Sequence, residues 1–140
     1  ELVTPNLDEA ALLLGRRIAR ADDMPAAAQA LLALGARAVL LKGGHLPGEQ
    51  VLDVLAIAGQ PPRLLQDARI ATPNLHGAGC TLSSAIAAQL ALGLDLPAAV
   101  QAARSYVRQA LAAGAKVRTG QGVGPLNHGF APLPTRLGAL

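Results

Sequence analysis

Runs rich in Ala and Leu, bounded by residues that start or stop helices, alternate along the chain with short apolar runs bounded by turn residues. The longer runs predict helices from the Asn6 cap to Leu14, from Met24–Pro25 to Gly35, from Cys80 to Leu92, and from Pro97 to Gly114. Asn6 and Glu9 have the spacing of a capping box. Pro25 suits a first helical turn, and Asp95 stands where it can cap the last helix.

The short apolar runs predict strands at Leu2–Val3, Ala38–Leu41 and Val51–Ala58. A turn with two prolines follows the third, so we expect Arg63–Gln66 to return as its hairpin partner and Arg69–Ala71 to extend the sheet. From Lys116 onward Gly and Pro dominate, which predicts an irregular tail. Strands that alternate with helices indicate an α/β fold, and we expect residues 1–140 to form one unit.

Composition favours a folded chain without a nucleic-acid or membrane partner. Hydrophobic residues make up 51% of 140 residues, enough for a buried core. The net charge is +3, but the basic residues are scattered apart from Arg16–Arg17, and the aromatic residues that stack on bases are almost missing. No apolar run approaches the roughly 20 residues that span a bilayer. The single cysteine cannot form an internal disulfide, so we expect a soluble, cytoplasmic chain.

The stretch His76–Ser84 leads from small residues into an apolar helix. Gly77 and Gly79 allow a ligand to approach the backbone closely, and a first helical turn has unpaired N–H groups at the positive end of the helix dipole. Together they predict a site for an anion, most naturally a phosphoryl group. The stretch is neither a P-loop nor a dinucleotide fingerprint, and the glycines alone fit a tight loop-to-helix turn better.

Cys80 adds a thiol at the start of this predicted helix. A helix N-terminus favours the thiolate, which can accept a proton from an alcohol that attacks phosphorus, act as a nucleophile, or serve in redox chemistry. A redox role would be better supported by a second cysteine, but Cys80 is the only cysteine in the sequence. The alternative is that Cys80 is a small buried hydrophobic residue without a chemical role. Its position alone supports the functional and the structural interpretation equally.

Four segments resemble those of hydroxymethylpyrimidine/phosphomethylpyrimidine kinases, which belong to the ribokinase-like superfamily. They occur in family order and are Val3–Ala10, Val39–His45, Asn74–Ala88 and Gly124–His128. The third resembles the family's Gly-Thr-Gly-Cys anion hole, where most ribokinase-like sugar kinases have Asp in place of Cys. The resemblance implies a ribokinase-like layered sheet with helices on both faces, and a kinase that uses ATP and Mg²⁺ in thiamine biosynthesis.

The resemblance also implies roles for individual residues. Cys80 would be the base that deprotonates the substrate hydroxyl. The N–H groups of Gly77, Ala78, Gly79 and Cys80 would hold the charge on the transferring phosphoryl group. Lys42 would place a cation against the phosphates, and Glu9 with Asn6 would hold Mg²⁺ through water.

Each role has a structural alternative. Glu9 can be simply the third residue of a capping box, and Lys42 an ordinary charge at a strand end. Lys42 and Lys116 are the only lysines beside many arginines, which leans toward a role for a compact ammonium. His45, His76 and His128 are too widely spaced to indicate a metal site, and we expect them to be structural.

The pattern departs from the family in places. Ala78 replaces the usual Thr and removes a hydroxyl that could assist the phosphate. Asp is common in the family where Ala71 stands, and Thr where Leu75 stands; we attach no mechanism to either change.

The matched segments all come from the carboxy-terminal half of the family. The resemblance therefore implies that the amino-terminal half, with most of the pyrimidine pocket, is lacking. We expect a second copy, a separate amino-terminal chain or a longer polypeptide to complete the sheet. Two rival hypotheses stay open: a related vitamin kinase acting on pyridoxal or hydroxyethylthiazole, and a non-catalytic ribokinase-like module that binds a ligand.

Overall fold

The structure is a computed structural model, and it describes residues 1–132. It divides into two compact units, residues 1–69 and residues from 70 onward, and each is described by itself. No helix in the described residues combines the length and apolar character needed to cross a lipid bilayer.

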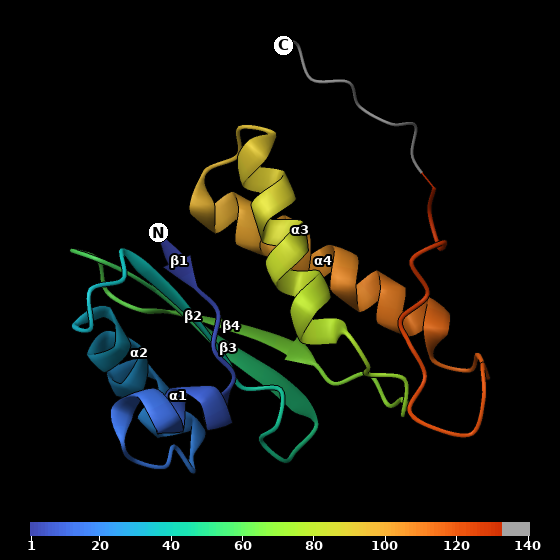
Figure 1. The fold of residues 1–140 in the computed structure, drawn as a ribbon, viewed down its shortest axis with the longest axis horizontal. Helices are drawn as coiled ribbons and strands as arrows, with labels where there is room; N and C mark the ends of the chain where they lie inside the picture. The colour runs from blue at the N-terminus through green and yellow to red at the C-terminus, as the bar shows by residue number, and fades with distance from the viewer. Residues whose placement is uncertain (133–140) are drawn as a thin grey trace. The chain divides into compact units, whose positions relative to one another are not determined.

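The first unit is built on a four-stranded sheet in the order β1-β2-β3-β4 (Figure 1). The strands are β1 (Leu2–Val3), β2 (Ala38–Lys42), β3 (Gln50–Ile57) and β4 (Arg63–Ala68). β1 runs parallel to β2, and β2, β3 and β4 are antiparallel neighbours. The predicted hairpin is confirmed, and β2 is buried at its first four positions, as its continuous apolar run suggests.

Two helices, α1 (Leu7–Leu14) and α2 (Met24–Leu32), pack with this sheet, and a 3₁₀ turn at Ala21–Asp23 leads into α2. α1 starts at a capping box and ends at Gly15, which adopts a left-handed φ of 65°. Met24 and Leu31 of α2 pack with Val39 and Val54 of the sheet in one buried apolar cluster. α2 ends three residues before Gly35, slightly earlier than its sequence predicts.

The prediction that Arg69–Ala71 extends the sheet is wrong, because β4 ends at Ala68. The backbone N–H of Arg69 still bonds the carbonyl of Glu49 at 2.7 Å. Its guanidinium turns to the loop after β2 and donates to the carbonyls of Gly44 and Gly48 at 2.9 and 2.8 Å. It also bonds the carbonyls of Leu46 and Gln50. The side chain thus holds a loop in place of continuing a strand.

The second unit contains two packed helices, α3 (Ala78–Ala91) and α4 (Leu96–Gly114), shown in Figure 1. α4 is capped by Asp95, whose side chain accepts the N–H of Ala98 at 2.8 Å, as expected. α3 begins two residues earlier than predicted, because Gly77, with φ 84°, makes the turn into the helix. Arg104 of α4 is buried; desolvation, and then the charge of Arg108, lower the pKa of its guanidinium.

The chain after α4 is irregular as far as it is described, which agrees with the predicted tail. The tail makes an isolated β-bridge between Pro125 and His76, and Leu126 is buried. The end of the predicted tail, residues 133–140, lies outside the described residues.

Candidate active site

The loop from Leu75 turns into α3 at Gly77, whose φ of 84° is left-handed. No side chain of the described residues caps α3 at Gly77, so amides of its first turn can bond an external acceptor. The N–H of Ala78 is the exception, because it donates to the carbonyl of Leu75 at 3.1 Å. The remaining predicted donors are the N–H groups of Gly77, at the helix cap, and of Gly79 and Cys80 in the first turn.

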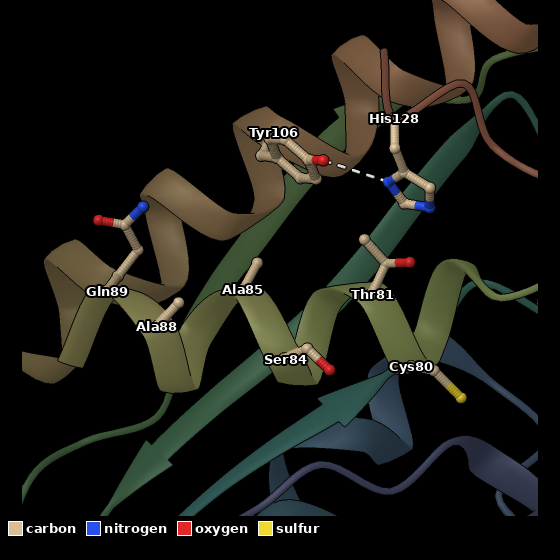
Figure 2. Close-up of a pocket in the computed structure, with 8 residues that line it drawn as sticks. All are labelled: Cys80, Thr81, Ser84, Ala85, Ala88, Gln89, Tyr106 and His128. Carbon is tan, nitrogen blue, oxygen red and sulfur yellow. Dashed lines mark hydrogen bonds between the residues drawn. The ribbon is translucent and has the colours of Figure 1, made fainter. Parts of the chain in front are cut away.

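Cys80 is exposed, which is the condition that its predicted chemistry requires. It lies at the rim of an open pocket of about 490 Å³, lined also by Thr81, Ser84, Ala85, Ala88, Gln89, Tyr106 and His128. Figure 2 shows the sulfur pointing away from Tyr106 and His128, while Thr81 points toward them. The thiol is therefore accessible at the start of α3 and points away from the side of the pocket formed by Tyr106 and His128.

Tyr106 and His128 form a polar contact in this pocket that sequence reasoning missed. The hydroxyl of Tyr106 lies 3.1 Å from Nδ1 of His128, and the two rings are stacked with centroids 6.1 Å apart. The ring of Phe130 also contacts Tyr106, with the two centroids 5.3 Å apart. The sequence has one Tyr and one Phe, Tyr106 and Phe130. That rarity was the sequence signal that could have pointed to this contact.

In the first unit, Asn6 and Lys42 meet where the parallel strands β1 and β2 end. They form an isolated parallel bridge, and the N–H of Lys42 bonds the carbonyl of Pro5 at 2.9 Å. The carboxyl ends of parallel strands are where α/β proteins bind ligands. The structure therefore brings the predicted phosphate-binding lysine to the residue that begins α1.

Glu9 and Asn6 bond each other's backbone reciprocally. The N–H of Asn6 donates to Oε2 of Glu9 at 2.7 Å, and the N–H of Glu9 donates to Oδ1 of Asn6 at 2.8 Å. The capping box is thereby confirmed. The box uses one oxygen, Oε2, of this exposed carboxylate.

The loop after Lys42 is held at both ends. The N–H of Gly43 donates to the buried carboxylate of Asp53 at 3.0 Å. Farther along, Nδ1 of His45 lies 3.4 Å from Oδ2 of Asp8 in the first turn of α1. With Arg69 on its carbonyls, the loop is a fixed continuation of β2 rather than a loose turn.

Comparison with known proteins decides the family. A family profile described as phosphomethylpyrimidine kinase matches residues 1–127. The chain belongs to the phosphomethylpyrimidine kinase family. The hydroxymethylpyrimidine/phosphomethylpyrimidine kinase of Rhizobium meliloti is 49% identical to it over 128 residues, which are 91% of this chain and 48% of that protein. The family predicted from the four segments is confirmed.

Solved structures agree with this family assignment. The ADP complex of Bacillus subtilis pyridoxal kinase matches with a TM-score of 0.84 and 38% identity, over 91% of this chain and 48% of that one. The Staphylococcus aureus pyridoxal kinase with AMP-PCP and pyridoxal matches with a TM-score of 0.85 and 35% identity, over 91% and 47%. The ribokinase-like α/β fold class is confirmed, and the chain spans about half the length of the relatives it matches.

In this phosphomethylpyrimidine kinase family member, the predicted residues fall into two sets. Asn6, Glu9 and Lys42 lie together in the first unit. Gly77 to Cys80 lie together in the second unit. Within residues 1–132 there is no cluster of three or more His, Cys, Asp or Glu side chains suited to a metal. The oxygens of Asn6 and Glu9 nevertheless fit Mg²⁺, which in kinases keeps several waters and binds one or two carboxylates plus substrate phosphates.

Proposed function

We propose that this chain is the ATP- and phosphate-handling part of a kinase of thiamine biosynthesis, acting in the cytoplasm. It would transfer the γ-phosphoryl group of ATP to hydroxymethylpyrimidine and then to its monophosphate. The observation that carries the proposal is the exposed Cys80 beside uncapped amides at the start of α3, in a chain of this family.

Each step has a group on the chain to perform it. The amides of Gly77, Gly79 and Cys80 hold the charge that develops on the equatorial oxygens of the phosphoryl group. The Cys80 thiolate accepts the proton of the substrate hydroxyl as its oxygen attacks phosphorus and ADP leaves. Lys42 neutralises charge on the phosphates. Glu9 and Asn6 would hold Mg²⁺ through water, and the ion when bound would supply positive charge against the phosphates.

This proposal requires a further half of the protein to complete the site. The relatives are about twice as long as this chain, so we propose that the acceptor pocket is completed by the part that this chain does not cover. A second copy or a separate chain would serve as well as a longer polypeptide.

Pyridoxal is the second candidate substrate. The two solved structures compared above are named pyridoxal kinases, at 38% and 35% identity. By resemblance, the cysteine in the anion loop favours a pyrimidine or thiazole kinase over a sugar kinase with Asp there, and the relative of higher identity carries the pyrimidine kinase name.

A substrate panel tests the proposal. This chain would be joined to the part of the Rhizobium meliloti kinase that it does not cover, and ADP release would be followed with hydroxymethylpyrimidine, its monophosphate, pyridoxal or no acceptor. We expect turnover with the two pyrimidines. Turnover with pyridoxal alone would replace the substrate. ATP binding without turnover on any acceptor would favour the non-catalytic module, with Ala78 as its sign.

A further inference from the structure

Asn74 is a buried polar residue six positions before Cys80, in the loop that leads into α3. Its side chain is 5% exposed. The side-chain NH₂ donates to the carbonyls of Gly114 at 2.7 Å and Val117 at 2.8 Å. Its Oδ1 accepts the N–H of Gly124 at 3.2 Å. One amide therefore joins the end of α4, the turn after it and the carboxy-terminal segment.

The packing around this amide leaves no space for a side chain at Gly124. A Cβ at Gly124 would overlap the Asn74 side chain, so glycine is required there for close approach. The carbonyl of Gly124 accepts the N–H of His76 at 3.2 Å, and Pro125 bridges His76. The loop and the carboxy-terminal segment are thus paired at His76 as well as at Asn74.

Hydrogen bonds also hold the residues just before and just after Asn74 in the loop. The hydroxyl of Thr72 accepts the N–H of Asn74 at 3.0 Å and lies 3.3 Å from the carbonyl of Ala115. At the other end, the carbonyl of Leu75 accepts the N–H of Ala78, the first residue of α3. The same carboxy-terminal segment delivers His128 to the pocket beside Cys80 (Figure 2).

The chemistry of the contacts explains why this residue is an amide. Two of its partners are carbonyl oxygens and the third is an N–H, so the position needs two donors and one acceptor. An aspartate of the same shape would keep the acceptor but would place a carboxylate against two carbonyls. A buried carbonyl without a donor is costly.

We propose that Asn74 is a positioning residue, which fixes the loop ahead of α3 to segment 114–127 and so sets the amides and the Cys80 thiol of the phosphate site. The proposal rests on the proposed function only in taking the start of α3 as that site. The segment Gly124–His128 resembles the family but had no role assigned to it. In this proposal it helps to position the phosphate site.

The thiol of Cys80 reports the position of the helix start without any need for turnover. It is the chain's single cysteine and is exposed, so alkylation by iodoacetamide modifies one site. In Asn74→Asp we expect the alkylation rate of the folded chain to change by about fivefold or more, because unpaired carbonyls let the loop open. Circular dichroism, recorded below the unfolding transition, verifies that the helices are intact.

Asn127→Asp is the matched control. Its Oδ1 accepts the N–H of Gly129 at 3.0 Å, and the carboxylate keeps that bond, so the alkylation rate should stay that of the unchanged chain. If Asn74→Asp does not fold, Gly124→Ala takes its place, because it keeps Asn74 but pushes a methyl group against the amide. It should change the alkylation rate in the same way.

Rates equal to that of the unchanged chain in every folded variant would overturn the proposal. Protection of Cys80 by ATP in the unchanged chain is measured separately. Absence of that protection would count against the proposed function, while the variant rates would still decide the role of Asn74.

Discussion

Glu9 bonds the start of α1 with the same carboxylate that we propose holds Mg²⁺. Glutamine also completes a capping box, so Glu9→Gln separates the two roles. We predict that it changes the free energy of unfolding by less than about 1 kcal/mol, while the joined protein needs far more Mg²⁺ for turnover. Glu9→Ala should lose both the bond, about 1 kcal/mol in urea unfolding, and the metal. An unchanged Mg²⁺ dependence in Glu9→Gln would reject the metal role.

Cys80 is exposed and lies in the first turn of α3, so its replacement should leave folding almost intact. For Cys80→Ala we predict a change in the free energy of unfolding within about 0.5 kcal/mol. Turnover of the joined protein should fall by about 10²- to 10⁴-fold, the usual contribution of a general base. Single-turnover measurements distinguish this loss from slow product release. Undiminished turnover would remove the proposed base and leave the amides to act alone.

At the scale of elements, the loop after β2 depends on Arg69. Its guanidinium bonds the carbonyls of Gly44, Leu46 and Gly48, and lysine cannot reproduce that fork. Arg69→Lys should therefore speed amide hydrogen exchange in residues 43–49, by a local free energy of about 1–3 kcal/mol. Arg63→Lys is the control, because that guanidinium bonds the exposed side chain of Gln60. Equal exchange in the two variants would show that the loop holds itself.

Elements with local signals were predictable from the sequence. The Asn6 and Asp95 caps fixed the starts of α1 and α4 to within a residue, since a cap acts on amides a few residues away. α3 began early because its turn comes from the backbone of Gly77 rather than from a capping side chain. The sequence predicts Arg69 in a strand, since no local pattern reveals a side chain that binds carbonyls far back along the chain.

The candidate site divides in the same way. The capping box and the glycine turn before Cys80 follow from neighbours in sequence and were predicted. The meeting of Asn6 with Lys42 and the contact of Tyr106 with His128 join distant segments. Such contacts depend on strand register and on the packing of a tail, which residue spacing does not encode.

At the scale of the whole molecule, β1 is an edge of the sheet and has two residues, of which Val3 is 41% exposed. An edge strand with free backbone groups invites pairing. We predict that light scattering finds a species heavier than the 14.2 kDa of one copy. Val3→Lys should return it to a single copy, because a charge on an edge blocks pairing. A single copy at every concentration of the unchanged chain would contradict this prediction.

Adjacent glycines after Lys42 should behave oppositely in a library of random substitutions. A methyl group on Gly43 would overlap the carbonyl of Leu52 and the side chain of Met24, whereas at Gly44 nothing lies within 4 Å. We therefore predict that selection for folded protein leaves glycine at position 43 in nearly every surviving clone, while alanine and serine appear freely at position 44. Sequencing the survivors would measure the difference, and equal tolerance at both positions would contradict it. The second glycine of the Lys-Gly-Gly segment, if it is invariant under selection for catalysis, would then owe that to the ligand and not to the fold.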